Sequence, residues 1–311
     1  MQYLVTGGAG FIGSNIVEEL VKRGEKVRVL DNFSTGKREN LVEFSEQIEL
    51  VEGDIRSYHV VQEAVDGIDV ILHQAALPSV PRSVRDPITT NEVNVTGTLN
   101  VLKAAKDAKV SRVVYASSSS VYGNNPELPK HEGMIPNPLS PYAVSKLAAE
   151  KYCAVFSKVY GLETISLRYF NVFGPRQDPN SQYSAVIPKF IKAIMNGEHP
   201  VIYGDGEQSR DFTFVANAVE TNLLAATADC ESGIALNCAC HGQITVNDLV
   251  EKIGRIFQKS VKPLFKEPRA GDVKHSFADI RLAEKMIRYQ PLVDFDQGLV
   301  LTTRWFQGNH S

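Results

Sequence analysis

The sequence has little of what disulfide-stapled and metal-binding proteins need. It holds only four cysteines in 311 residues, too few for a disulfide framework. Cys238 and Cys240 alternate in "ALNCAC", and we interpret them as small buried side chains of a strand rather than as a redox or metal pair. None of the seven histidines has metal-ligand spacing to another histidine or to a cysteine, so the sequence predicts no metal site.

A dominant charge and long apolar runs are also missing. The formal net charge is −3, which argues against general affinity for nucleic acid or for an anionic membrane. No apolar run approaches the roughly 18 residues that a membrane-spanning helix needs. The N-terminal "MQYLVTGG" has neither a basic segment nor a cleavage site, so we expect a cytoplasmic location.

Regular alternation of strand and helix patterns fills the first half of the chain. Short apolar runs predict strands at 3–7, 26–31, 48–54, 69–76, 111–118 and 163–171, and longer amphipathic patterns predict helices at 10–24, 91–108 and 142–160. This alternation predicts an α/β fold of the Rossmann type, a doubly wound parallel sheet covered on both faces. After Asn171 the elements become shorter and richer in Pro, Gly and Asp, which indicates a smaller C-terminal lobe from about 171 to 311, with the chain free to cross back.

A glycine-rich turn joins the first predicted strand to the first predicted helix. Gly7, Gly10 and Gly13 form a G-x-x-G-x-x-G pattern in this position, which is typical of a dinucleotide site. Asp31 closes the second strand, where a carboxylate suits two ribose hydroxyls and repels a 2′-phosphate. NAD is therefore favoured over NADP. Asp54, at the end of the third strand, is a weaker candidate for contact with the adenine edge.

A second cluster of polar residues lies where the fifth strand ends. Four serines, 117–120, follow that strand, and about twenty residues later Tyr142 and Lys146 share one face of a helix. A Tyr–Lys pair alone is more often plain surface. Beside NAD, however, an ammonium and a cationic nicotinamide would lower the tyrosine pKa, and a serine hydroxyl would share the proton. Together these features predict a centre for proton and hydride transfer.

Several longer motifs extend this interpretation to nearly the whole chain. With these motifs, "TGGAGFIG", "DNFSTG", "HQAA", "YASSSSVYG", "SPYAVSK", "LRYFNVFGPRQDP", "GDGEQSRDF" and "RAGDVKHSFADI", the sequence resembles the extended short-chain dehydrogenase/reductase superfamily and, within it, the nucleotide-sugar 4-epimerases. The resemblance implies a seven-stranded NAD-binding Rossmann domain, 1–170, and a mainly nucleotide-sugar-binding domain, 171–311. The family's usual "REGD" is "RAGD" in this chain.

The resemblance also implies roles for individual residues. Tyr142 would take the proton of the sugar 4-hydroxyl, Lys146 would bind the nicotinamide ribose, and Ser118 would complete the triad, with Ser119 as its competitor. Asn171 would contact the diphosphate, and Arg210, Arg269 and Asp272 would hold phosphate and uridine. The full cofactor set is Gly7, Gly10, Phe11, Ile12, Gly13, Asp31, Asn32, Ser34, Gly36, Asp54, Ile55, Gln74, Ala75, Ala76, Asn94, Ser117, Tyr142, Lys146 and Tyr169. The substrate set is Ser118, Ser119, Asn171, Gln177, Val186, Tyr203, Arg210, Arg269, Asp272 and Ser276.

The reaction follows from what the motifs lack. Similar dehydratases carry an Asp-Glu pair where Ser119 and Ser120 stand, and a similar decarboxylase carries Glu at the second position, so plain 4-epimerisation through a 4-keto sugar is favoured. The small Ser276 leaves room for an N-acetyl group, which favours UDP-GlcNAc and UDP-GalNAc, with UDP-glucose and UDP-galactose also accepted.

Three further expectations remain open on sequence alone. One alternative is a UDP-glucuronate 4-epimerase or decarboxylase, in which Arg82 or Arg85 would bind the sugar carboxylate. Another is a non-catalytic NAD-binding regulator, against which the intact triad argues. The resemblance also implies a homodimer formed by a four-helix bundle of helices 91–108 and 142–160, through Val93, Val95, Leu99, Ala148, Ala149, Tyr152 and Phe156.

Overall fold

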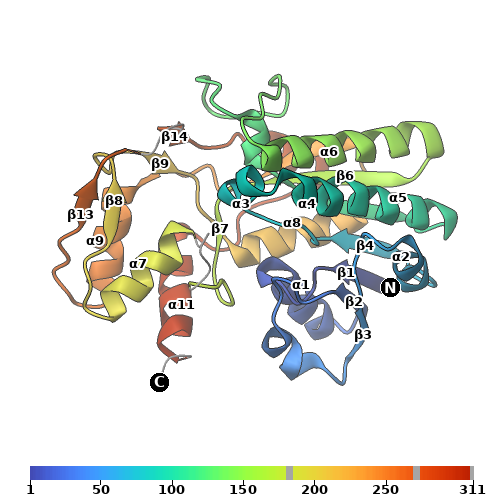
Figure 1. Cartoon of the computed structure of the whole chain (residues 1–311), viewed down its shortest axis with the longest axis horizontal. Coiled ribbons are helices and arrows are strands. Elements are labelled where there is room, and N and C mark those ends of the chain that lie inside the picture. The colour runs from blue at the N-terminus through green and yellow to red at the C-terminus, as the bar shows by residue number, and fades with distance from the viewer. Residues whose placement is uncertain (180–184, 269–273, 309–311) are drawn as a thin grey trace.

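A seven-stranded parallel sheet forms the centre of the molecule (Figure 1). The computed structural model describes residues 1–179, 185–268 and 274–308. The strand order is β11-β6-β5-β4-β1-β2-β3. The strands are β1 (Gln2–Thr6), β2 (Lys26–Asp31), β3 (Ile48–Glu52), β4 (Val70–His73), β5 (Arg112–Ser118), β6 (Glu163–Tyr169) and β11 (Ile234–Cys238). The order reverses between β1 and β4, so the predicted doubly wound Rossmann sheet is confirmed.

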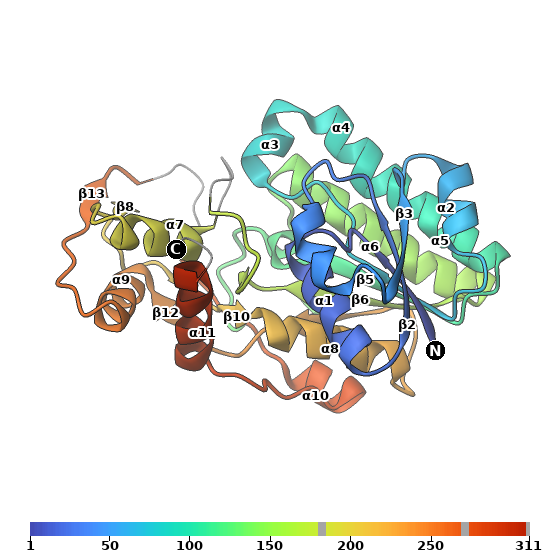
Figure 2. The same cartoon turned by 90° about the horizontal axis from the view of Figure 1, so that it is seen from below.

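Helices cover both faces of this sheet because successive strand residues point to opposite sides. Val5, Val29 and their equivalents pack with α1 (Phe11–Lys22) and α8 (Val215–Thr227). Leu4, Leu30 and their equivalents pack with α2 (Tyr58–Ala64), α5 (Thr98–Asp107) and α6 (Pro141–Tyr160). Figure 2 shows α1 and α8 on one side of the strands and α2, α5 and α6 on the other.

Most element boundaries agree with the sequence, with small shifts at their ends. Predicted strands 48–54, 69–76 and 163–171 stop two or three residues early, and after the first two of them the chain turns away to line a cavity. The helix expected at 91–108 starts earlier and consists of α4 (Pro87–Asn91), the π-helical η2 (Glu92–Gly97) and α5. Asp86 caps its start by accepting a hydrogen bond from the Thr89 N–H at 3.0 Å. The short elements η1 (Arg38–Phe44), α3 (Val80–Arg85) and η3 (Ser119–Tyr122) complete this part of the chain.

A smaller lobe lies beside the carboxyl ends of the strands, on the left of Figure 1. It contains α7 (Val186–Met195), α9 (Val246–Ile256) and α11 (Phe295–Gly308), the parallel pair β8 (Val201–Tyr203) and β13 (Leu264–Lys266), and the three-stranded sheet of β12 (Ile244–Thr245), β9 (Ser209–Arg210) and β14 (His275–Ser276). The pair β7 (Val172–Phe173) and β10 (Thr213–Phe214) lies between the lobe and the sheet, as Figure 1 shows.

The chain returns from the smaller lobe to the large sheet. After residue 170, α8 packs on the sheet, β11 pairs in parallel with β6, and α10 (Arg281–Ile287) packs against β11. The division into a cofactor part, 1–170, and a sugar-nucleotide part, 171–311, stays a prediction. None of the helices in the described part of the chain combines the length and the apolar character of a membrane-spanning segment. Within the same residues, no group of His, Cys, Asp and Glu has the geometry of a metal site.

Candidate active site

The turn between β1 and α1 is tight enough to require its glycines. Gly7 has φ +68°, and a Cβ on it would lie 2.7 Å from the backbone nitrogen of Ala75. A Cβ on Gly13 would lie 2.1 Å from the carbonyl oxygen of Gly7. Gly10 caps α1 without any side-chain hydrogen bond, and the first turn holds no acidic residue. The N–H groups of this turn therefore suit the pyrophosphate of NAD.

A cavity opens from this turn along the carboxyl ends of the strands. Seventeen of the nineteen predicted cofactor residues line it: Gly7, Gly10, Phe11, Ile12, Gly13, Asp31, Asn32, Ser34, Asp54, Ile55, Gln74, Ala75, Ala76, Ser117, Tyr142, Lys146 and Tyr169. The other lining residues, which the sequence did not assign to the cofactor, are Leu30, Thr35, Gly53, Leu77, Pro78, Ala116 and Val93, the last of which was expected at the dimer contact instead. Most of them are neighbours of motif residues, and Leu77, Pro78 and Val93 carry no chemistry that a sequence pattern would mark.

Gly36 and Asn94, the other two predicted cofactor residues, support the cavity from behind its wall. A Cβ on Gly36 would lie 2.9 Å from the carbonyl carbon of Ala9, so this glycine lets its loop pack against the glycine-rich turn. Asn94 is buried and holds Leu77 by two hydrogen bonds, accepting from its N–H at 2.8 Å and donating to its carbonyl at 3.1 Å. It also donates to the Ser145 hydroxyl at 3.0 Å. The structure therefore places both residues behind the predicted contact surface.

Asp31 lies at the end of β2 with its carboxylate turned toward the glycine-rich turn. Oδ2 accepts from the Ala9 N–H at 2.9 Å, and Oδ1 accepts from the Phe33 N–H at 2.8 Å. Burial raises the pKa of Asp31, and these backbone N–H groups partly offset the rise. Each carboxylate oxygen keeps a further lone pair for a ribose hydroxyl.

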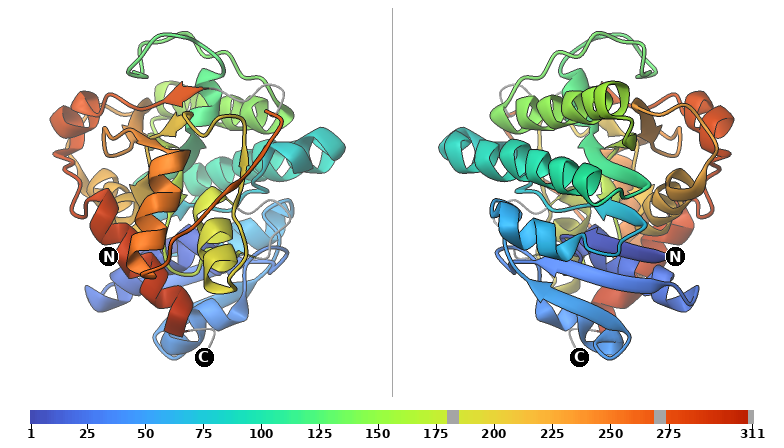
Figure 3. Two further views of the ribbon diagram at one scale, coloured as in Figure 1. Left: turned by 90° about the vertical axis from the view of Figure 1, so that its left-hand side faces the viewer. Right: turned by 90° about the vertical axis from the view of Figure 1, so that its right-hand side faces the viewer.

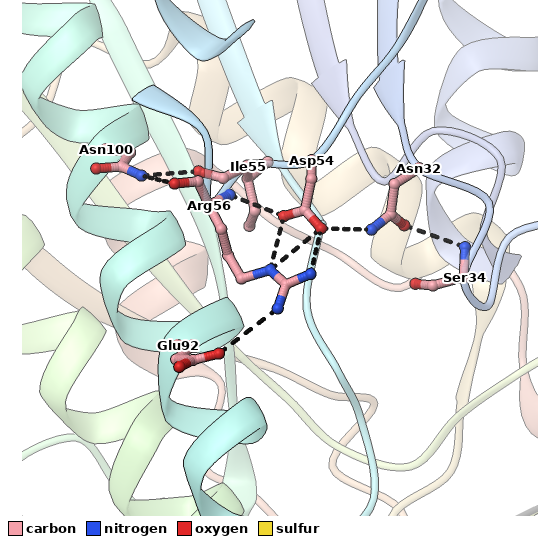
Figure 4. A network of polar contacts seen from close by, with 7 residues as sticks. All are labelled: Asn32, Ser34, Asp54, Ile55, Arg56, Glu92 and Asn100. Atoms are coloured by element: carbon pink, nitrogen blue, oxygen red, sulfur yellow. Dashed lines mark hydrogen bonds and ion pairs between the residues drawn. The ribbon is translucent and has the colours of Figure 1, made fainter. Parts of the chain in front are cut away.

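Asp54 belongs to a polar network at the same end of the cavity, shown in Figure 4. Its Oδ2 accepts from the Asn32 amide at 2.9 Å and from the Arg56 guanidinium at 2.8 Å. The Arg56 hydrogen bonds lower the pKa of Asp54, which keeps it ionised. Asn100 fixes the backbone here by donating to the carbonyl groups of Ile55 and Arg56. The network holds Asp54 in place at the cavity wall.

Ser118 and Tyr142 meet at the end of β5. The Ser118 hydroxyl lies beside the Tyr142 phenol, close enough to act against the rise in its pKa, and accepts from the Ser120 N–H at 3.2 Å and the Ser120 hydroxyl at 2.9 Å. Ser140 caps α6 by accepting from the Ala143 N–H at 3.1 Å, which places Tyr142 in the first helical turn. Ser119 begins η3 and is half-buried. The geometry therefore favours Ser118 over Ser119 as the partner of the phenol.

Burial shifts the pKa of both Tyr142 and Lys146. It raises the pKa of Tyr142, and the neighbouring Ser118 hydroxyl only partly opposes the rise. Lys146 Nζ lies 5.9 Å from the centre of the Tyr142 ring and donates to the Ala116 carbonyl at 2.8 Å. Burial lowers the pKa of Lys146 to about 7. The expectation that the Lys146 ammonium and a cationic nicotinamide together lower the tyrosine pKa concerns the NAD-bound protein and stays a prediction.

Gln74 and Tyr169 close the cavity between β4, β6 and α8. The Tyr169 hydroxyl donates to Gln74 Oε1 at 3.1 Å, and Gln74 Nε2 donates to Asn222 Oδ1 at 3.0 Å. Asn222, on α8, donates back to the Tyr169 oxygen at 2.6 Å. Sequence reasoning missed Asn222, because nothing in a helix pattern marks the one buried polar residue that faces a sheet end.

Predicted substrate residues gather around a second cavity in the smaller lobe. Val186, Tyr203 and Arg210 line it, together with residues that the sequence did not single out: Lys189, Phe190, Ala193, Glu198, His199, Pro200, Val201, Ile202, Gln208 and Val246. Ser276 lies beside this cavity because β14 pairs with β9, and Ser276 is the register partner of Arg210. The sequence did not reveal this cavity as a whole, because its wall combines α7, β8, β9 and α9, which lie far apart along the chain.

The remaining predicted substrate residues lie elsewhere. Asn171 is exposed, has φ +37°, and donates to the Asp211 carbonyl at 2.9 Å. Gln177 is half-buried and donates to the Val172 carbonyl at 3.2 Å. Arg269 and Asp272 lie outside the described residues.

Comparison with known proteins shows the family of the chain. A sequence model described as "NAD dependent epimerase/dehydratase family" matches residues 3–239. A solved UDP-N-acetylglucosamine 4-epimerase from Methanobrevibacter ruminantium M1, in complex with UDP-N-acetylmuramic acid, is 42% identical, with a TM-score of 0.95 over 99% of this chain and 98% of that one. A UDP-glucose 4-epimerase of Mycolicibacterium smegmatis is 37% identical over 316 residues, covering 99% of both chains. A UDP-glucuronate 4-epimerase of Thermodesulfobacterium geofontis is 33% identical over 318 residues, covering 99% of this chain and 96% of that one.

The chain therefore belongs to the NAD-dependent epimerase/dehydratase family. It is an enzyme of the extended short-chain dehydrogenase/reductase type, and its cofactor is NAD. The predicted resemblance to nucleotide-sugar 4-epimerases is confirmed at the level of the family.

Proposed function

We propose that this protein interconverts UDP-hexoses that differ at C4, with UDP-GlcNAc and UDP-GalNAc as preferred substrates and UDP-glucose and UDP-galactose also accepted. The position of Ser118 beside the phenol of Tyr142, which lines the cofactor cavity, is the observation that carries the proposal. It puts a proton-transfer pair where a Rossmann sheet presents the reactive end of its dinucleotide.

The chemistry divides between the cofactor and the chain. Bound NAD supplies a hydride acceptor beside the sugar, and its cationic ring favours the Tyr142 phenolate. Tyr142 Oη takes the proton of the sugar 4-hydroxyl, and Ser118 holds the sugar oxygen and shares the proton. Lys146 binds the nicotinamide ribose from α6. Bound NAD would also return the hydride to the other face of the 4-keto sugar, which would give the epimer and leave the cofactor unchanged.

The serines after β5 favour epimerisation over elimination. Ser119 and Ser120 stand where dehydratases that resemble this chain carry acidic residues. The N–H and the hydroxyl of Ser120 both donate to the Ser118 hydroxyl, so this residue supports the triad instead of acting on the sugar. An acid/base group for loss of water is therefore lacking at this position.

The size of the sugar pocket is the basis for N-acetylated substrates. Ser276 is small and half-buried, and it is the register partner of Arg210, which lines the second cavity. Purified enzyme should interconvert all four UDP-sugars, with both N-acetylated ones turned over at least as fast as the others. Activity confined to UDP-glucose and UDP-galactose would refute the argument from Ser276. A Ser276→Tyr variant should lose the N-acetylated pair and keep the other.

A uronate substrate is the second candidate, and a relative named UDP-glucuronate 4-epimerase is the reason to keep it. Arg82 and Arg85, on α3, would then bind the sugar carboxylate. Mass spectrometry of the products separates the cases, since epimerisation conserves mass and decarboxylation releases carbon dioxide.

A non-catalytic NAD-binding regulator is the alternative from another class. It would show no transient absorbance in the NADH band and no turnover after addition of any UDP-sugar. The described triad geometry argues against it.

We also propose a homodimer, through surfaces that differ in part from the sequence prediction. Ala149 and Phe156 are wrong as contact residues, because both are buried in the core of the subunit. The exposed apolar residues on α6 are Val144, Tyr152, Val155, Val159 and Tyr160, and on neighbouring α3 and α4 they are Val80, Val84 and Ile88. Figure 3, in its right half, shows α6 and the α4–α5 run side by side on the outside of the sheet. The cytoplasmic location stays a prediction.

A further inference from the structure

A buried ion pair lies one helical turn beyond Lys146. Arg168, on β6, donates to Glu150, on α6, through Nη2 at 2.6 Å and through Nε at 3.0 Å. The two side chains are 3% and 6% exposed. A buried ion pair is often no more stabilising than well-packed apolar residues, because both charges lose their hydration. Its presence at this depth therefore calls for a reason other than stability.

Glu150 also holds the end of the strand that carries the triad serine. The Ser117 hydroxyl donates to Glu150 Oε2 at 2.8 Å. Ser117 and Arg168 are register partners on β5 and β6, so one carboxylate fixes neighbouring strands at the same height. Ser117 lies in the cavity wall directly before Ser118. Movement of Glu150 would therefore be passed to Ser118, which lies beside the Tyr142 phenol.

The pair also determines which partner Lys146 takes. Lys146 and Glu150 are four residues apart on α6 and share a face, the spacing at which Lys and Glu form ion pairs. Lys146 nevertheless donates to the Ala116 carbonyl, and the ion pairs among the described residues join Glu150 to Arg168 and not to Lys146. Besides its two hydrogen bonds to Glu150, Arg168 donates through Nη1 to the Tyr122 oxygen at 2.9 Å, which holds the guanidinium in place.

We propose that Glu150 and Arg168 are positioning residues of the reaction centre: Arg168 neutralises Glu150, so that Lys146 stays at the cofactor cavity and Ser117 holds the end of β5. The proposal rests on the roles proposed above for Tyr142 and Lys146. Without Arg168, the Glu150 carboxylate would draw the Lys146 ammonium away from Ala116 and from the nicotinamide ribose.

The test uses NAD-loaded enzyme and compares a variant that lacks only the Arg168 charge with one that lacks both charges of the pair. Arg168→Met should lower kcat per bound NAD by at least about tenfold, since small displacements of catalytic groups cost that much or more. KM for UDP-GlcNAc should stay within about twofold, because neither residue lies in the second cavity. The Glu150→Gln/Arg168→Met double variant has neither charge and can still accept from Ser117, so its kcat should return to within about threefold of wild type.

A crystal structure of NAD-loaded Arg168→Met gives a readout that does not depend on turnover. It should show Lys146 Nζ paired with Glu150 in place of the Ala116 carbonyl. Arg112→Met is the matched control, because Arg112 is buried on β5 and pairs with Glu163 at the far end of the same two strands. It should reduce thermal stability and leave kcat per bound NAD unchanged.

Three outcomes would overturn the proposal: wild-type kcat in Arg168→Met, Lys146 still bound to Ala116 in that variant, or a folded double variant no faster than the single one. If Arg168→Met fails to fold, the double variant alone tests the proposal. A folded double variant as inactive as Tyr142→Phe would contradict the claim that Arg168 acts by neutralising Glu150. Full activity of Tyr142→Phe itself would instead refute the proposed function and leave the crystallographic result on Lys146 standing.

Discussion

The proposed mechanism places its greatest chemical demand on Tyr142. Its phenol lies beside Ser118, and burial raises its pKa, so at neutral pH the protein alone holds it protonated. The catalytic role of this residue stays a prediction from the sequence. A spacing of four on a helix predicts that Tyr142 and Lys146 share a face; it does not predict that Lys146 turns to a carbonyl of β5.

Tyr142→Phe should fold as wild type, keep its NAD and lose about 10²- to 10⁴-fold in kcat, because removal of a general base costs roughly that factor. Circular dichroism, the absorbance of bound cofactor and a coupled epimerase assay measure the three properties. Near-wild-type turnover would remove Tyr142 from the mechanism.

His73 makes stability depend on pH. It is buried at the end of β4 between the hydroxyls of Thr6 and Thr98, with Nδ1 2.6 Å from one and Nε2 3.0 Å from the other. Burial lowers the pKa of His73 to about 3, below the value near 6.5 of an unfolded chain. The unfolded state therefore binds the extra proton as the pH falls below 6.5, and the stabilising contribution present above that pH is lost.

From pH 7 to pH 5 this residue should remove about 2 kcal/mol from the free energy of unfolding. Urea denaturation at both values measures the loss, and His73→Asn should abolish it. The same substitution at His59, which is exposed on α2, should leave it intact. An unchanged pH dependence in His73→Asn would show that another group is responsible.

Helix α6 connects local sequence signals to the chemistry. Ser140 and Pro141 predict its start, and Gly161 at φ +70° ends it, so both ends were readable from the sequence. Three positions spaced by four, Tyr142, Lys146 and Glu150, all face the end of β5. The sequence could not show what Glu150 meets, because its partner Arg168 lies on the next strand and is brought there only by the register of the sheet.

Ser140→Ala should cost about 1 kcal/mol of stability, the usual value for loss of an N-cap. It should also reduce kcat several-fold, because Tyr142 lies in the turn that frays. Asp294→Ala removes a comparable cap from α11, where Asp294 accepts from the Gln297 N–H at 2.8 Å. That control should lower the melting temperature by a similar amount without an effect on kcat. Equal kcat in both variants would argue against transmission through the first turn of α6.

The predicted elements of the first half agree best with the structure, because strands β1 to β6 are short apolar runs and α1, α5 and α6 are long enough to show a hydrophobic period. The short α2 and η1 were not predicted. Prediction also failed where pairing is non-local. Strands β9, β12 and β14 have two residues each and exist only because distant segments meet, so no local pattern marks them. The second cavity, to which β9 contributes Arg210, was accordingly predicted only through family motifs.

In the molecule as a whole, helix α6 has two different sides. Val144, Tyr152, Val155 and Val159 lie on the side of the helix opposite Tyr142, Lys146 and Glu150, as positions spaced along a 3.6-residue period require. All four are more than a third exposed, at 52%, 38%, 48% and 63%. An apolar stripe of this kind on a helix surface fits a second copy of the same helix.

Light scattering should therefore give a mass of twice 34.3 kDa for the wild type. Val155→Glu with Val159→Glu should halve that mass, because two charges cannot be buried in an apolar contact. Val42→Glu, a substitution at an equally exposed apolar residue far from α6, should leave the mass unchanged. A monomeric wild type would dismiss the dimer.

The return of the chain to the sheet limits how this protein can be divided. Strand β11 pairs with β6 over five residues, and Asn237 within it accepts from the Tyr122 hydroxyl at 2.7 Å and donates to the carbonyls of Lys130 and Asp279. A gene fragment that stops at residue 170 would expose the whole edge of β6, which is a site for aggregation. Grafting a foreign sugar-binding lobe onto this cofactor domain would therefore require splicing at several points, with residues 215–238 retained from the host.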